Sequence, residues 1–162
     1  MTTQPVCTST ATDTSLVGQY PITCSGGAAD NYDFTYVNGK LTILYNFSGF
    51  FQPVDNQPFL NIANSGRTIP IKWRLTDYYG NPVTNLSSVK VTAVTLVCSL
   101  GTSPDQVEEY ATGSSGLQNL GNGYYQFNWA TPKSYAGSCK TLLLDLGEGP
   151  GLEHTALFQF TK

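Results

Sequence analysis

The stretch RTIPIKWRLTD, residues 67–77, indicates the fold class because its apolar and polar side chains alternate. Alternation with a period of two is typical of a β-strand with one buried and one solvated face. Pro70 interrupts the pattern, because proline cannot donate a hydrogen bond to a neighbouring strand. Proline and lysine both discourage pairing between exposed sheet edges. We therefore expect a strand at or near a sheet edge, with Lys72 in a protective, structural role on a solvent face that also holds Pro70 and Arg74. The expected inward set is Ile69, Ile71, Trp73 and Leu75.

The composition narrows the class of protein. The 162 residues suffice for one large β domain or two small ones. Charged residues make up 12%, about half the usual share. A net charge of −3 without a basic run argues against nucleic acid and anionic membranes as partners. No run approaches the roughly 20 apolar residues of a membrane-spanning helix. These features predict an all-β protein without membrane insertion.

Four cysteines, whose spacing fits no common zinc site, are better explained by disulfide bonds. Three connectivities are open, and one of them keeps each bond within one half of the chain: Cys7–Cys24 and Cys98–Cys139. Disulfides imply an oxidising compartment, so we expect an extracellular or cell-surface protein. The start MTTQPVC lacks the features of a signal peptide. We therefore expect a fragment of a longer exported protein.

Residues 1–44 predict a small, incomplete β unit of two hairpins. Segments 5–12 and 19–26 form the first hairpin, with Cys7 and Cys24 bridging its strands. The second is centred on Asn38-Gly39, a strong signal for a two-residue turn. Four strands are too few for an independent core, so an unpaired edge and an uncovered apolar face are expected. No flexible spacer follows, which predicts a stiff junction.

Residues 45–162 predict an immunoglobulin-like β-sandwich of about seven strands. After a loop-like entry, the apolar run SSVKVTAVTLVC (87–98) reads as a central strand, and a polar loop follows with a short strand at 107–110. Segment 116–132 reads as a hairpin with a Gly-Asn-Gly turn, whose second arm turns Tyr125, Phe127 and Trp129 to one face. A closing hairpin over 138–162 turns Ala156, Phe158 and Phe160 inward.

Two families resemble parts of this chain. The stretch from Thr8 to Ile43, with its VGQYPITCSG core and YVNGKLTI end, resembles the second half of an MBG-type domain, a repeat module of bacterial surface proteins. Residues 45–162 resemble the PxKF domain through YNFSGFFQPVDN, PIKW, AGSCKTLLLDLGEG and ALFQF, with Trp73 where that family usually has phenylalanine. The resemblance implies an extracellular accessory module without catalytic residues.

Covalent and metal chemistry have weak candidates. An intramolecular isopeptide bond needs a lysine buried beside an amide or acid side chain and a catalytic carboxylate. Lys72 points away from the apolar face, and Lys90 or Lys140 would qualify only on a strand buried on both faces. A calcium site could use only the last turn, which lacks regular spacing, so no metal is expected. Its oxygen and nitrogen donors would be Asp145, Glu148, Glu153 and His154.

Enzymatic chemistry is not expected. Glu108 and Glu109 are adjacent, so on a strand they face opposite sides. His154 is the only histidine available as a base, and it begins a strand. No nucleophile elbow or phosphate-binding loop is present. We predict no enzyme activity and no cofactor.

Exposed aromatic side chains are the remaining candidate site. Tyr78 and Tyr79 in the DYYGNP turn, and Tyr110, could stack on sugar rings. Tyrosines in such turns more often pack over the ends of a sandwich. Carbohydrate binding at a surface glycan is therefore kept as an alternative.

We conclude from the sequence that the chain is a non-catalytic structural or adhesive module of a bacterial surface or secreted protein. It would act as a stiff, disulfide-stapled spacer in a repeat array, in contact with neighbouring domains. The alternatives are a self-assembling fibre subunit, completed by strand addition from another copy of the protein, and a carbohydrate-binding accessory domain.

Overall fold

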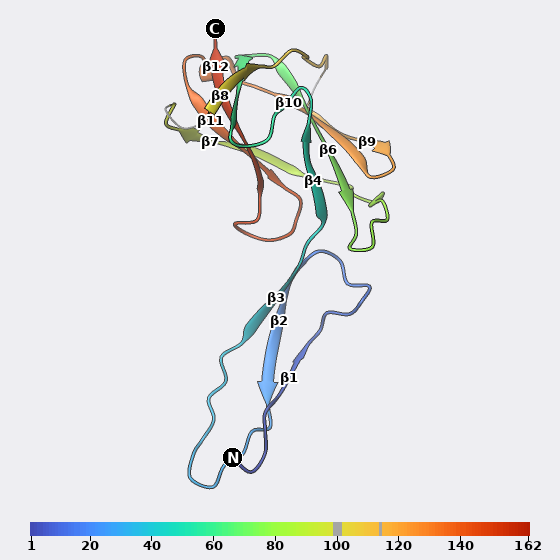
Figure 1. Cartoon of the computed structure of the whole chain (residues 1–162), viewed down its shortest axis with the longest axis vertical. Helices are drawn as coiled ribbons and strands as arrows, with labels where there is room; N and C mark the ends of the chain where they lie inside the picture. The colour runs from blue at the N-terminus through green and yellow to red at the C-terminus, as the bar shows by residue number, and fades with distance from the viewer. Residues whose placement is uncertain (99–101, 114) are drawn as a thin grey trace. The chain divides into compact units, whose positions relative to one another are not determined.

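The computed structural model describes residues 1–98, 102–113 and 115–162. The chain is all-β, as the sequence predicts, with a single short 3-10 helix, η1 (Lys133–Tyr135), among these residues (Figure 1). It forms two compact units, one of residues 1–44 with 147–150 and one of residues 45–146 with 151–162.

The N-terminal unit holds one three-stranded sheet in the order β1-β2-β3. Its strands are β1 (Val6–Ser9), β2 (Gly18–Ser25) and β3 (Gly39–Ile43). The expected first hairpin is present, since β1 and β2 pair antiparallel. The expected second hairpin is wrong: β3 pairs with the free edge of β2, and neither Asn38 nor Gly39 adopts a positive φ. The Asn38-Gly39 dipeptide does not form a hairpin turn, because no strand directly precedes it that could pair with β3.

The second unit contains a four-stranded sheet in the order β4-β6-β10-β9. Its strands are β4 (Asn46–Phe51), β6 (Thr68–Thr76), β9 (Gly116–Gly121) and β10 (Tyr124–Ala130). The strand predicted around RTIPIKWRLTD is confirmed as β6. The hairpin β9–β10 is also confirmed, because Asn122 and Gly123 between its strands both have positive φ, at 52° and 78°.

The expected position of β6 at a sheet edge is wrong, because β6 lies between β4 and β10. Pro70 is also buried rather than solvent-facing. The Arg67 carbonyl accepts from the Thr131 N–H and the Leu75 N–H donates to the Gly123 carbonyl, both on the β10 side. Backbone groups at odd positions therefore face β10, and Pro70, at an even position, faces the side of β4. The β4 ladder ends at Lys72. A central strand therefore tolerates proline here because no neighbouring carbonyl of β4 requires its missing N–H.

A five-stranded sheet in the order β7-β11-β12-β5-β8 completes the second unit. Its strands are β5 (Phe59–Asn64), β7 (Lys90–Leu96), β8 (Thr102–Gln106), β11 (Cys139–Asp145) and β12 (His154–Thr161). The closing hairpin β11–β12 is as predicted. Strand β5 pairs in parallel with both β12 and β8, a feature that the sequence pattern does not indicate.

Three expectations for this region are wrong. The loop-like entry contains two strands, β4 and β5, and the short strand lies at 102–106 instead of 107–110. The run at 87–98 forms an edge strand, β7, rather than a central one. Its inward residues Val91 and Ala93 pack on the core while Val94 is 48% exposed. The apolar character of both faces therefore reflects exposed valine, not burial on both sides.

The two sheets of the second unit share one hydrophobic core. Residues such as Ile71, Trp73 and Tyr125 from one sheet and Leu142 and Phe158 from the other are fully buried. The Trp129 ring meets Phe158 and Phe160 edge to face, with centroids 5.2 and 5.8 Å apart. These contacts across the layers make the unit a β-sandwich, and the inward placement of Ala156, Phe158 and Phe160 is confirmed.

Candidate functional site

The turn after β6 presents two tyrosines to solvent. The Asp77 carboxylate accepts hydrogen bonds from the backbone N–H groups of Tyr79 and Asn81, at 2.9 and 2.8 Å, and from Asn81 Nδ2 at 2.9 Å. The side-chain bond from Asn81 is the main cause that lowers the pKa of Asp77. Tyr78 and Tyr79 are 93% and 81% exposed, with centroids 5.4 Å apart. An aspartate-fixed turn therefore carries an exposed aromatic pair.

Tyr110 does not join this pair. Its hydroxyl accepts a hydrogen bond from the Asn64 N–H at 2.9 Å, and the Arg67 guanidinium lies 5.0 Å from its ring centroid. Arg67 precedes β6, whereas Tyr78 follows it. The nine residues of β6 span roughly 26 Å at the usual rise of a strand. The three tyrosines therefore do not form a common binding surface.

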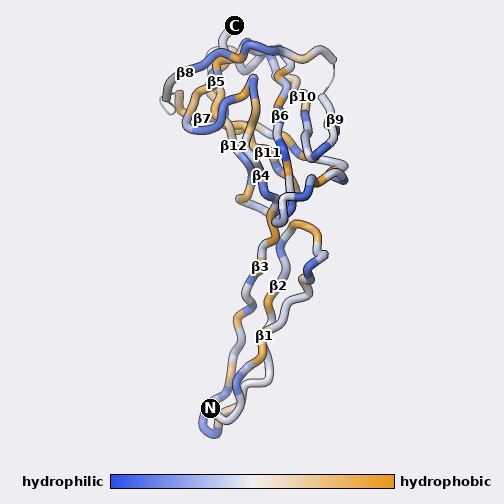
Figure 2. The backbone as a smooth tube through the Cα atoms, turned by 45° about the vertical axis from the view of Figure 1, so that its right-hand side comes forward, coloured by the Kyte–Doolittle hydropathy of each residue, from blue (hydrophilic) through white to orange (hydrophobic). Residues whose placement is uncertain are grey.

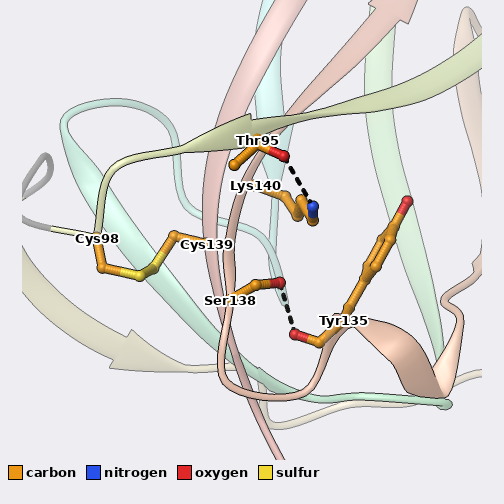
Figure 3. The surroundings of a disulfide bond; sticks show 6 residues. All are labelled: Thr95, Cys98, Tyr135, Ser138, Cys139 and Lys140. Atoms are coloured by element: carbon orange, nitrogen blue, oxygen red, sulfur yellow. Dashed lines mark hydrogen bonds between the residues drawn. A yellow bond between two sulfur atoms is a disulfide. The ribbon is translucent and has the colours of Figure 1, made fainter.

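Each of the two disulfides joins cysteines of the same unit: Cys7–Cys24 lies in the first and Cys98–Cys139 in the second. Cys7 and Cys24 are opposite partners on β1 and β2. Cys98 follows the edge strand β7 and is bonded to Cys139, the first residue of β11 (Figure 3). This is the connectivity that keeps each bond within one half of the chain. The second bond ties the end of an edge strand to its only sheet neighbour among the described strands.

The lysines considered for an isopeptide bond lack the required surroundings. Lys72 makes an ion pair at 2.7 Å with Glu109, whose side chain is 57% exposed. Lys140 Nζ donates to Thr95 Oγ1 at 3.1 Å and lies 4.9 Å from the Tyr135 ring centroid (Figure 3). A hydroxyl and a ring cannot form the amide, and Lys90 is exposed. The described contacts therefore offer no lysine for this reaction.

The candidates for metal and acid–base chemistry are dispersed. Across residues 1–98, 102–113 and 115–162, no three His, Cys, Asp or Glu side chains lie close enough to hold a metal ion. His154 begins β12 and stacks on Phe47, with ring centroids 3.8 Å apart. Burial and a hydrogen bond to the Asp105 side chain raise the pKa of Asp55, but these two carboxyl groups are only a pair.

The three-stranded sheet of the N-terminal unit has one apolar face. Partners in register place the Cys7–Cys24 bond, Tyr20, Ile22 and Leu41 on one side, and residues such as Thr23, Lys40 and Thr42 on the other. Apolar and polar residues accordingly alternate along β2 and β3 (Figure 2). None of residues 1–44 is buried. Tyr20, Ile22 and Cys24 are half-buried and Leu41 is exposed, so the apolar face is only partly covered.

A second group of exposed aromatic residues, which sequence analysis missed, lies on the outer face of the four-stranded sheet. Phe51 on β4 and Tyr124 on β10 have ring centroids 5.9 Å apart, and Arg74 on β6 lies over the Tyr124 ring. The alternation in β6 indicates that Arg74 faces outward. The sequence did not predict Phe51 on this face, because its segment was expected to be a loop-like entry rather than strand β4.

Comparison with known protein families finds a match in the N-terminal unit. Residues 1–42 match the family model of the MBG domain (YGX type). This supports the MBG part of the resemblance, while the PxKF resemblance of residues 45–162 stays a prediction. No curated protein matches the chain.

Among solved structures, the chain is similar to the crystal structure of the S-layer protein SbsC domains 4 and 5. The identity is 15% and the TM-score 0.37, over 91% of this chain and 60% of that one. The chain thus spans less than two thirds of the solved structure. Among the described residues, no helix is long and apolar enough to cross a bilayer.

Proposed function

We propose that the chain is a non-catalytic, extracellular structural module of a bacterial surface or secreted protein, acting as a stiff spacer in a repeat array. The observation that carries the proposal is the MBG-domain match over residues 1–42. The two disulfides support it, because such bonds persist in oxidising compartments outside the cytosol.

The covalent arrangement suits a spacer. Each disulfide staples one unit internally, so that the unit cannot extend fully while the bond is intact. Only Leu44 and Tyr45 separate β3 from β4. A connection this short, without a Gly/Ser tract, favours a stiff junction.

The location can be tested on the producing cells. Antibodies raised against the purified chain should label intact cells or detect the protein in the culture medium. Labelling that appears only after lysis would refute an extracellular role.

Junction stiffness can be tested by ¹⁵N relaxation with a matched variant. Insertion of Gly-Gly-Ser between Leu44 and Tyr45 should decouple the tumbling of the two units, whereas the native chain should tumble as one body. Equal tumbling behaviour of the two proteins would refute the stiff spacer.

A second candidate function, assembly into a fibre by strand addition from another copy, is favoured by the apolar face of the β1-β2-β3 sheet, which is only partly covered. Among the described strands, the outer strands of this sheet, β1 and β3, each pair with β2 alone. An edge that is open and a face that is apolar fit the addition of a strand from an identical chain.

Light scattering over a concentration series tests assembly in non-reducing buffer. The mass should rise above 17.5 kDa with concentration. Leu41→Glu, on the apolar face, should abolish the rise, and Thr42→Glu, on the opposite face of the same strand, should retain it. A constant mass near 17.5 kDa for the native chain would exclude assembly and leave the spacer proposal standing.

A further inference from the structure

The outer face of the four-stranded sheet carries an ordered set of side chains. The register aligns Phe51 of β4 with Lys72 of β6 and Gln126 of β10. Arg74 and Tyr124 form the next row toward the end of β6. The intervening residues of β6 and β10 point into the core, so these side chains point away from it.

Two aromatic rings lie open on this face. Phe51 is 38% and Tyr124 43% exposed, although each is held on a strand rather than on a loop. Their centroids are 5.9 Å apart and their planes are inclined by 42°. Rings anchored on two strands of one sheet offer a fixed apolar surface at little cost in side-chain entropy.

The charge on the face is uneven. Lys72 is paired with Glu109 at 2.7 Å. Arg74 lies 5.3 Å from the Tyr124 ring centroid and donates from Nε to the Asn122 carbonyl at 3.2 Å. These two contacts position the guanidinium and leave its positive charge without a carboxylate partner in the described part of the chain. Arginine binds carboxylates through two parallel hydrogen bonds.

We propose that Phe51, Arg74 and Tyr124 form a binding site for a saccharide that carries a carboxylate, such as a uronic acid residue. The sugar ring lies on the aromatic surface, and its carboxylate binds the Arg74 guanidinium. The exposed Gln118 of β9 supplies an amide group for the hydroxyls. Its cross-strand partner Gln126 of β10 is half-buried and donates from Nε2 to Asn128 Oδ1 at 2.8 Å, so it offers its side-chain carbonyl as an acceptor. Charge complementarity selects an acidic over a neutral sugar.

The exposed tyrosine pair after β6 does not fit the same ligand. Tyr79 is hydrogen-bonded through its backbone to the Asp77 carboxylate, whose negative charge repels an acidic sugar. The ion pairs and cation–ring contacts of the described residues include neither Tyr78 nor Tyr79. This pair therefore serves as the matched control surface.

The binding site goes beyond the structural role and is independent of it. A spacer can bind an acidic polymer at its side or remain inert, and the test of junction stiffness does not depend on the sugar. Failure of either proposal leaves the other standing.

The experiment is a titration of the ¹⁵N-labelled chain, followed by NMR, with glucuronate-terminated and glucose-terminated oligosaccharides that are otherwise identical. We expect saturable shifts at Phe51, Arg74 and Tyr124 with the glucuronate probe. The glucose probe should bind roughly tenfold or more weakly, because it lacks the charge-assisted hydrogen bonds.

Variants locate the contacts. Tyr124→Ala should abolish the shifts, and Arg74→Gln should reduce the affinity for glucuronate to that for glucose. Tyr79→Ala should leave both affinities unchanged. The spectrum of each variant reports whether it is folded, and Arg74→Gln decides the test if Tyr124→Ala is not.

Three outcomes would overturn the proposal. They are the absence of saturable shifts, equal affinity of the native chain for the two probes, and binding that is lost in Tyr79→Ala but retained in Arg74→Gln.

Discussion

The two disulfides determine how far the chain can be extended under force. While a disulfide is intact, the residues between its two cysteines do not contribute to the extended length of the chain under force. The sequence separations are 17 for Cys7–Cys24 and 41 for Cys98–Cys139. The bonded Cα atoms already span 4.0 and 5.2 Å. At about 3.5 Å per extended residue, the bonds shorten the unfolded chain by about 55 and about 140 Å. Full reduction should therefore lengthen it by about 190 Å.

Single-molecule force spectroscopy with handles at both termini measures this length directly. The native chain should be pulled with and without reductant. Two paired variants separate the contributions. The variant with Cys7→Ser and Cys24→Ser should lose only the shorter increment, and the variant with Cys98→Ser and Cys139→Ser only the longer one. A chain without any cysteine should not respond to reductant.

The size of the increment distinguishes the connectivities. A Cys7–Cys139 bond would join cysteines 132 positions apart in the sequence, and a Cys24–Cys139 bond cysteines 115 positions apart. Either would raise the increment to about 400 Å or more. An increment of that size, or none, would refute the arrangement of one staple in each unit and with it the mechanical reasoning behind the spacer.

The other predictions concern stability and are measured by urea denaturation. Trp73 Nε1 is the one buried side-chain donor or acceptor without a partner in the described residues. Trp73→Phe should therefore change the free energy of unfolding by less than about 1 kcal/mol, because loss of the unsatisfied N–H offsets the cavity, whereas Trp129→Phe should cost about 1–2 kcal/mol. Equal costs would contradict this. Gly123→Ala should cost more than about 2 kcal/mol, since its Cβ would collide with a backbone carbonyl of β6 in addition to the strain of a φ of 78°. Gly80→Ala, at a φ of 85° with open space, should cost less, and the reverse order would be inconsistent with the turn geometry. Because the pKa of Asp77 is lowered on folding, its stabilising effect is present above the ordinary value of 3.8 and is lost as the pH falls through the folded value. Asp77→Asn should thus flatten the acidic limb of the stability profile, and an unchanged limb would argue against the hydrogen bonds at the turn.

Local signals predicted the elements whose partners lie close in sequence. The alternation over 67–77 identified β6, and the Asn122-Gly123 turn joined β9 to β10 because both residues adopt positive φ. The same dipeptide at 38–39 misled, since the turn propensity of Asn-Gly is realised only where two strands meet.

The choice of partner between distant strands could not be predicted locally. Periodicity reports which side chains share a face but not which strand lies alongside, so β6 and β7 exchanged their central and edge positions relative to the expectation. For the candidate sites, the turn composition named Tyr78 and Tyr79, although packing over the end of the sandwich was the more frequent expectation, and the structure leaves both exposed. The cluster of Phe51, Arg74 and Tyr124 depends on the register of three strands and is visible only in the fold.

The position of β12 has a consequence for how the second unit folds. Within the second unit this strand comes last in the sequence, yet it lies between β11 and β5, and its partner Leu60 precedes Leu157 by almost the whole unit. Pairings at such separation close large loops and slow folding. During synthesis, β5 and β8 therefore remain without their neighbour β12. By contrast, β1, β2 and β3 can pair as soon as Ile43 has left the ribosome. The sandwich therefore stays open until β12 has been synthesised, which keeps this unit extensible up to that point.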